Sequence, residues 1–266
     1  MIKVVNGKKL ALEKERTLKQ KVRLLNQREI NPAMAVLFFE NDRAGRLYSK
    51  LKQEAGKRIG IRVIRMPVNS KRQLKNMLVM FSKDKKIDGI VVQYPGLGWA
   101  KKILMSKNKF IFWWQKLIKR IPRHKDIDGL RDDSGFDMGA VKAVEEILKR
   151  YAQKGRAAIV GAKGFTGRKI ITRLDRLGYV VKGLDIRDDL KIEAGKADIL
   201  ITATGVKNLI KSEMVKKGAM VIDLGWPEAE VDFEAVKKRA GVITPVPGGV
   251  GPLTVVNLLE NLVNKW

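Results

Sequence analysis

The apolar positions in the first half of the chain follow two alternating patterns. One recurs every three or four residues, which is typical of helices that bury one face. The other is continuous, as in the run AMAVLFF, and is typical of a strand buried on both faces. The first pattern predicts helices around residues 11–25, 44–55 and 74–81, the second of them closed by Gly60. The second pattern predicts strands at 33–39, 62–66 and 87–93. Strands that alternate with helices in this way build a mostly parallel sheet.

The same alternation resumes from about Gly139. An apolar stripe at 141–151 predicts a helix, and another from Leu253 predicts a helix that ends the chain. Between them we expect strands at 157–160, 179–184, 198–202 and 219–224. Turn and cap residues cluster just before Gly139, in LRDDSGFDM, which marks a domain boundary. We therefore expect an α/β protein with two domains, one of residues 1–137 completed by the helix 253–266 and one of residues 138–252.

A glycine-rich loop follows the predicted strand 157–160 and opens a helix. Glycines let the chain turn tightly, and the amides of a helix N-terminus can bind a pyrophosphate. The spacing is G-x-x-G-x-x-G and not the usual G-x-G-x-x-G, so a strand-to-helix turn without a ligand is the alternative. We interpret the loop as the cofactor site of a Rossmann-type domain, formed by Gly161, Ala162, Lys163, Gly164, Phe165, Thr166 and Gly167.

An acid at the end of the next predicted strand bears on the choice of cofactor. Asp185 could accept hydrogen bonds from the ribose hydroxyls and would repel a 2′-phosphate, which favours NAD over NADP. Lys182 or Arg187 could instead bind that phosphate, so NADP stays open. The other residues predicted to bind the cofactor are Ile186, next to the acid, and Thr204 and Gly205, in a glycine turn after the strand 198–202.

Tyr48 and Lys52 are four residues apart in a predicted helix, so they share one face. Leu47, Leu51 and Ala55 form the adjoining stripe, which we expect to be buried. A lysine at the edge of a core loses hydration, which disfavours its charged form and suits it to proton transfer. A solvated lysine beside a tyrosine is the other interpretation of the pair.

Six segments occur in an order that resembles a known family. They are Tyr48-x-x-x-Lys52, VVQYP at 91–95, KDIDG at 125–129, the loop 161–167, DLG at 223–225 and TPVPGGVGPLT at 244–254. The last is an eleven-residue stretch rich in glycine and proline, too specific for a generic loop. Together they resemble the bifunctional methylenetetrahydrofolate dehydrogenase/cyclohydrolase family over essentially the whole chain.

The resemblance implies a reaction and a set of site residues. Members oxidise 5,10-methylenetetrahydrofolate with a nicotinamide cofactor and hydrolyse the methenyl product to 10-formyltetrahydrofolate. Lys52 would act in the proton transfers of the hydrolysis, and Gln93 would hydrogen-bond to it. Tyr48 would stack on the folate, and Asp128 would bind the pterin ring. Further substrate contacts, in the cleft between the domains, would come from Gly248, Gly249, Pro252 and Thr254. The resemblance also implies a homodimer.

The chain departs from the family pattern at several positions. Gly45 stands where a serine is usual, and Ala162 replaces an arginine that commonly follows the first glycine of the cofactor loop. Losing that arginine agrees with Asp185 in favouring NAD. The family's Pro-x-Thr-Pro motif is replaced by GFDM in a shortened loop, which leaves the retention of both activities open.

Composition excludes some classes of site. The chain has no cysteine and one histidine, so disulfides and thiolate or histidine-rich metal sites are excluded, and we predict no metal. No apolar run is long enough for a transmembrane helix, and we expect a cytoplasmic protein. The net charge of +27 attracts anions, but a generally lysine-rich composition would also produce it.

The segment 100–125 is longer than is usual in the family and has many basic and aromatic residues but no acid. It could pack on the substrate domain or across a dimer, attract the glutamate tail of a folate, or contact nucleic acid or lipid. The alternative function is therefore a catalytically reduced member of the fold that binds nucleic acid or a membrane surface. Because no nucleic-acid motif is present, we expect neither a specific nucleic-acid partner nor membrane contact. A shikimate-type dehydrogenase of similar layout is a third hypothesis.

Overall fold

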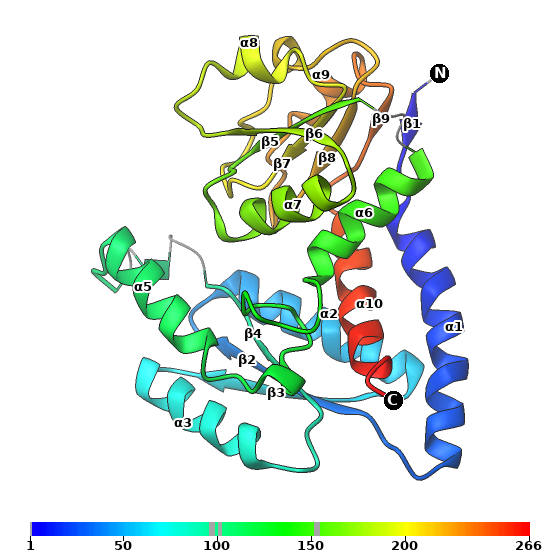
Figure 1. Cartoon of the computed structure of the whole chain (residues 1–266), viewed down its shortest axis with the longest axis vertical. Coiled ribbons are helices and arrows are strands. Elements are labelled where there is room, and N and C mark those ends of the chain that lie inside the picture. The colour runs from blue at the N-terminus through cyan, green and yellow to red at the C-terminus, as the bar shows by residue number, and fades with distance from the viewer. Residues whose placement is uncertain (1, 96–98, 101–102, 152–154) are drawn as a thin grey trace. The chain divides into compact units, whose positions relative to one another are not determined.

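The computed structural model describes residues 2–95, 99–100, 103–151 and 155–266 (Figure 1). Two compact units make up the chain. Unit 1 contains Met1–Leu12 and Gly139–Thr254, and unit 2 contains Glu13–Met138 and Val255–Trp266. The two-domain α/β prediction is confirmed, but the first twelve residues belong with the second half of the chain. They do so because β1 (Lys3–Val4) pairs with β9 (Val242–Ile243).

Unit 1 is built on a six-stranded sheet in the order β1-β9-β8-β7-β5-β6, and each of its pairs is parallel. The remaining strands are β5 (Arg156–Val160), β6 (Val180–Leu184), β7 (Ile199–Thr202) and β8 (Met220–Asp223). The helices that belong wholly to this unit are α6 (Gly139–Tyr151), α7 (Phe165–Arg176), α8 (Leu190–Ala194) and α9 (Phe233–Lys237). From β5 the chain passes to β6 on one side and then to β7 on the other. This reversal lies at β5, and ligands of open α/β sheets bind at the carboxyl ends of strands beside such a point.

Unit 2 has a three-stranded parallel sheet in the order β3-β2-β4. Its strands are β2 (Ala33–Phe39), β3 (Arg62–Val68) and β4 (Gly89–Val92). Its helices are α2 (Arg43–Ile59), α3 (Lys71–Lys83), α5 (Lys107–Ile118) and most of α1 (Gly7–Gln27) and α10 (Val250–Val263). The central strand β2 is buried at all seven positions, as its continuous apolar run predicted. Among the described residues, no helix has both the length and the apolar character needed to cross a membrane.

The buried face of α2 is not the one that its leucines predicted. Leu47 and Leu51 are 41% and 38% exposed, whereas Ser49 and Lys52 are buried. Small residues decide this orientation, because they let the helix lie close to the sheet. A Cβ added at Gly56 would lie 2.5 Å from Val63 Cγ2. The prediction that Leu47 and Leu51 form a buried stripe is therefore wrong, and its correction places Lys52 inside the unit.

Candidate active site

Lys52 is a buried amine in contact with two of the residues predicted to act with it. Its side chain is 1% exposed. Its Nζ donates a hydrogen bond to Gln93 Oε1 at 3.2 Å and lies 4.0 Å from the centroid of the Tyr48 ring. Burial lowers the pKa of Lys52 from 10.5 to about 8, while the charge of Asp128 opposes that shift. The four residues predicted to be catalytic therefore influence one another within unit 2.

Two elements of unit 2 bring Lys52 and Gln93 together at the carboxyl edge of its sheet. Gln93 follows β4, and its backbone amide donates to Leu37 of β2 at 2.8 Å. Lys52 belongs to α2, which follows β2. A Cβ added at Gly45 would lie 2.6 Å from Asp42 Oδ2, so a side chain there would require the Asp42 carboxylate to shift. The same Cβ would lie 3.5 Å from Gln93 Cβ, which is an ordinary contact distance and places the first turn of α2 against Gln93.

Asp128 lies in a turn that Asp126 holds in place. Asp126 is fully buried, and its carboxylate accepts hydrogen bonds from the backbone amides of Leu130 at 3.0 Å and Arg131 at 2.9 Å. Gly129 has φ +59°, in the left-handed region that favours glycine. The turn is therefore fixed by buried hydrogen bonds, and Asp126 is a supporting residue to which sequence reasoning gave no role.

Aromatic side chains pack α5 against the segment that follows Gln93. Tyr94 lies 5.5 Å from Phe110 and 5.0 Å from Trp114, measured between ring centroids. Trp99 lies 5.8 Å from Trp113. Phe110 and Trp114 are buried, and burial raises the pKa of Tyr94 to about 12. One side of the basic aromatic segment therefore packs on unit 2, as one of its interpretations predicted.

The glycine-rich loop of unit 1 turns sharply between β5 and α7. Gly161 has φ +90°, and its amide and that of Ala162 donate to Leu184 O at 2.9 and 3.1 Å. A Cβ added at Gly167 would lie 2.2 Å from Gly161 O, so a side chain there cannot be accommodated. Gly164 is the N-cap of α7, and no side chain caps that helix. Its first turn can therefore offer backbone amides to a pyrophosphate.

Asp185 follows β6 and lies next to the loop. Its Oδ2 lies 3.6 Å from the Nζ of Lys163, a residue of the loop itself. Ile186 is half exposed beside it. Asp185 thus lies beside the glycine loop, as predicted. Lys182, one of the two cations that could have bound a 2′-phosphate in its place, is paired with Glu193.

The buried carboxylate of Glu230 holds the turn at Thr204 and Gly205, which was predicted to bind the cofactor together with the glycine loop and Asp185. Glu230 is 2% exposed and accepts hydrogen bonds from the amides of Thr204 at 2.8 Å and Gly205 at 2.7 Å. It also accepts from the hydroxyl of Thr202. Asp223 accepts from the amide of Glu230 at 3.0 Å, and burial raises the pKa of Asp223 to about 6. These two acids brace the loops after β7 and β8. Sequence reasoning missed Glu230 because the segment PEAEVDF looks like a solvated turn.

The segment 244–254 packs against the start of α1 within unit 1. Gly248 has φ +111°, and its carbonyl accepts from the Lys8 amide at 3.2 Å. A Cβ added at Gly7 would lie 1.8 Å from Gly249 O. Pro252 and Thr254 are part of α10, which begins at Val250, three residues earlier than predicted. The substrate contacts of Gly248, Gly249, Pro252 and Thr254 remain a prediction.

Comparison with known proteins identifies both halves of the chain. The catalytic-domain model of tetrahydrofolate dehydrogenase/cyclohydrolase matches residues 5–128. The NAD(P)-binding-domain model of the same enzymes matches residues 138–266. Together the two models cover nearly the whole chain.

Curated relatives match this chain over nearly their whole length. The bifunctional protein FolD of Wolinella succinogenes is 35% identical, over 98% of this chain and 95% of the relative. That of Methanosarcina barkeri is 34% identical over the same shares. Among solved structures, the bifunctional methylenetetrahydrofolate dehydrogenase/cyclohydrolase of Campylobacter jejuni superposes with a TM-score of 0.86 at 30% identity, covering 100% of this chain and 98% of the other. Shikimate 5-dehydrogenase of Listeria monocytogenes reaches only 0.55 at 15% identity, covering 89% and 91%, which shows a shared fold alone. The chain belongs to the tetrahydrofolate dehydrogenase/cyclohydrolase family.

Proposed function

We propose that this protein oxidises 5,10-methylenetetrahydrofolate with a nicotinamide dinucleotide and hydrolyses the methenyl product to 10-formyltetrahydrofolate. The observation that carries the proposal is the buried Lys52 amine, which donates to Gln93 and has a pKa of about 8. It lies in the part of the chain that matches the family's catalytic domain. The folate would bind beside it, with Tyr48 stacking on the substrate and Asp128 binding the pterin ring.

Hydrolysis needs a group that can take a proton from water and return one. Water adds to the methenyl carbon and loses a proton to neutral Lys52. The bond from that carbon to the ring nitrogen N5 then breaks as N5 takes up a proton from the lysine, and the second proton of the water goes to solvent. With a pKa of about 8, about a tenth of the Lys52 amines are neutral at pH 7, against about three in ten thousand at 10.5. Burial thus increases the reactive form about 300-fold.

Oxidation makes a different demand on the chain. The dinucleotide supplies the hydride acceptor when it is bound. Hydride departure leaves a cation that the neighbouring nitrogen stabilises, so the chain must orient two rings and need not supply a strong base. The amides of the glycine loop and the Thr204–Gly205 turn held by Glu230 would position the dinucleotide.

We propose NAD as the preferred dinucleotide. Asp185 would accept hydrogen bonds from the ribose hydroxyls and repel a 2′-phosphate. Ala162 offers no charge at the position where the resemblance to the family leads us to expect an arginine, and Lys182 is paired with Glu193. The Asp185→Ser variant should shift the ratio of kcat/KM for NAD to that for NADP by at least about tenfold towards NADP. An unchanged ratio would remove Asp185 from cofactor selection.

We also propose a cytoplasmic homodimer. The edge strand β6 supports self-association, since it ends the order of the described sheet and Val180 is 70% exposed. An unpaired strand edge can pair with another chain. Sedimentation velocity should give twice the mass of 30.0 kDa, and a monomer at micromolar concentration would contradict the proposal.

Steady-state kinetics tests the function itself. Methylenetetrahydrofolate mixed with protein and either dinucleotide should give the absorbance of the reduced cofactor, faster with NAD. No reduction of either dinucleotide would contradict the proposed function.

A further inference from the structure

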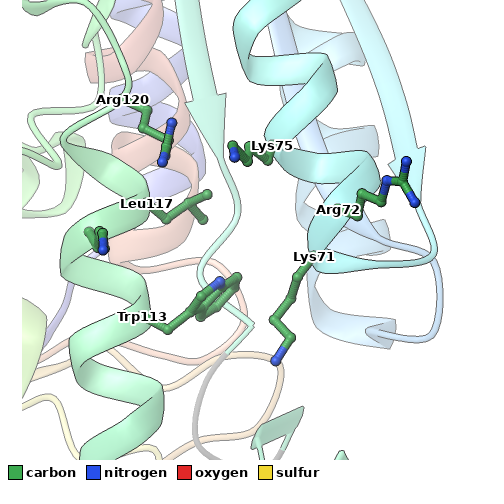
Figure 2. A pocket seen from close by; sticks show the side chains of 7 residues that line it. Lys71, Arg72, Lys75, Trp113, Leu117 and Arg120 are labelled. Carbon is green, nitrogen blue, oxygen red and sulfur yellow. The ribbon is translucent and has the colours of Figure 1, made fainter.

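A basic groove lies between α3 and α5, both in unit 2 (Figure 2). Its volume is about 420 Å³. Seven residues line it: Lys71, Arg72, Lys75, Trp113, Lys116, Leu117 and Arg120. Figure 2 shows Lys71 across from Trp113 at one end and Lys75 across from Arg120 at the other. Leu117, which is buried, lies on α5 between Trp113 and Arg120, and Arg120 follows the end of that helix.

The charge of this groove is of one sign. Five of its seven lining residues are cations, and neither α3 nor α5 contains an acid. Within the part of the chain that the structure describes, none of these five cations forms an ion pair with a carboxylate. Five cations around one groove repel one another, so an anionic ligand would relieve an existing cost.

Ring contacts connect the groove to Tyr94, the residue after Gln93. Its Trp113 lies 6.3 Å from Trp114, measured between ring centroids, and Trp114 lies 5.0 Å from Tyr94, which follows Gln93. Lys71 is the first residue of α3 and comes three residues after Val68, the last residue of β3. Gln93 follows the carboxyl end of β4 in the same parallel sheet. The groove and Gln93 therefore share one edge of that sheet.

The cations are spaced to follow an extended chain. Lys71 and Lys75 are one helical turn apart on α3, about 6 Å. On the other side of the groove, Lys116 lies in α5 and Arg120 follows the end of that helix. A γ-linked glutamate contributes five main-chain bonds, against three in an ordinary residue, so an extended γ-linked chain advances on the order of 6 Å per residue. Successive carboxylates of a short oligoglutamate can therefore meet cations that are one helical turn apart. A groove lined by a single tryptophan suits such a chain better than a run of stacked bases, which needs several exposed rings.

We propose that the groove between α3 and α5 binds the oligoglutamate tail of a folate substrate while the pterin end lies at Lys52 and Gln93. The inference rests on the proposed function and gives it a binding site for the glutamate tail of the substrate, apart from the site of the pterin end. It also assigns a role to the basic aromatic segment, whose aromatic side packs on unit 2 and whose cations line the groove.

The test compares substrates that differ only in tail length. KM is measured for methylenetetrahydrofolate with one and with five γ-linked glutamates. The variant Lys75→Gln/Arg120→Gln removes two groove cations at the end remote from Lys71. Its control, Lys19→Gln/Arg23→Gln, removes the same charge from exposed positions of α1. Exposed ion pairs weaken binding by up to about fivefold each when lost. We expect the groove variant to lose about five- to tenfold of the wild-type preference for the long tail, and the control to keep it.

A second measurement does not depend on turnover. A fluorescently labelled γ-linked pentaglutamate should bind the wild-type protein, and the groove variant should bind it about five- to tenfold more weakly. If both proteins turn over the folate and the groove variant prefers the long tail as strongly as the wild type does, the groove proposal is overturned and the proposed function stands. Pentaglutamate binding that depends on the groove, in a protein without folate turnover, would uphold the groove and overturn the proposed function. If single-stranded RNA or phosphatidylglycerol vesicles, and not pentaglutamate, lost binding in the groove variant, the proposal would also be overturned.

Discussion

The buried amine of Lys52 should make the stability of unit 2 depend on pH in a way that the Lys52→Met variant lacks. In the folded protein its pKa is about 8, against 10.5 for an ordinary lysine. Below pH 8 the amine is charged in both states, and the folded state bears the full cost of burying the charge. As the pH rises from 8 to 10.5, the folded protein has lost the proton while the unfolded chain still binds it. Stability therefore increases with pH across this window.

The size of the effect follows from the shift. Between pH 7 and pH 10 the wild type should gain about 2–3 kcal/mol of unfolding free energy relative to Lys52→Met. Methionine has no proton to lose, so its own contribution is constant. Lys52→Met also loses the hydrogen bond to Gln93. That loss offsets the difference in unfolding free energy between the two proteins by an amount that is constant below pH 8 and constant again above pH 10.5.

Tryptophan fluorescence during urea unfolding measures this difference in the relevant unit. Four of the five tryptophans, Trp99, Trp113, Trp114 and Trp266, lie in unit 2. Unfolding curves of wild type and Lys52→Met at pH 7, 8, 9 and 10 give the two free energies. The control is Lys57→Met, which changes an exposed lysine of the same helix. A wild-type minus Lys52→Met difference that stays constant from pH 7 to 10 would refute the claim that Lys52 is buried with a lowered pKa.

Three other predictions concern the two sites. The hydrolysis rate should rise with pH up to about 8 and then level off as Lys52 becomes neutral, and a rate that falls over pH 6–8 would exclude Lys52 as the base. Gly167→Ala forces a Cβ to within 2.2 Å of Gly161 O, so we expect about 1–3 kcal/mol lower stability and weaker dinucleotide binding by calorimetry; an unchanged Kd would contradict the loop assignment. Glu230→Gln places an amide where the backbone of Thr204 donates, and should cost about 1.5–3 kcal/mol in thermal or urea unfolding and raise KM for the dinucleotide. Wild-type values of both would show that Glu230 has no positioning role.

Continuous apolar runs and glycines were the most informative parts of the sequence. The prediction of a strand at 33–39 is confirmed to the residue by β2. The helix before Gly60 ends there with φ +89°, a conformation that favours glycine. Both signals are local, because a buried strand needs apolar side chains throughout and a left-handed cap needs a residue without a Cβ. The glycine loop at 161–167 was found on the same grounds.

Features that depend on distant parts of the chain were not found. β1 and β9 have two residues each, too short for a periodic pattern, and they pair across most of the chain. The face of α2 was misjudged because apolar periodicity counts leucines and ignores small residues that allow close packing. Glu230 is buried only because loops after β7 converge on its carboxylate. The basic groove needs two helices whose sequences are separated by β4.

The most direct test of the proposed function follows both reactions at once in wild type and Lys52→Met. With methylenetetrahydrofolate and NAD, the wild type should produce reduced cofactor and 10-formyltetrahydrofolate with little methenyl intermediate. Lys52→Met should still reduce the cofactor, accumulate the methenyl compound and hydrolyse it at least about 100-fold more slowly, since general acid–base catalysis contributes at least that much. Equal rates of methenyl hydrolysis in the two proteins would contradict the role of the buried lysine on which the proposed function rests.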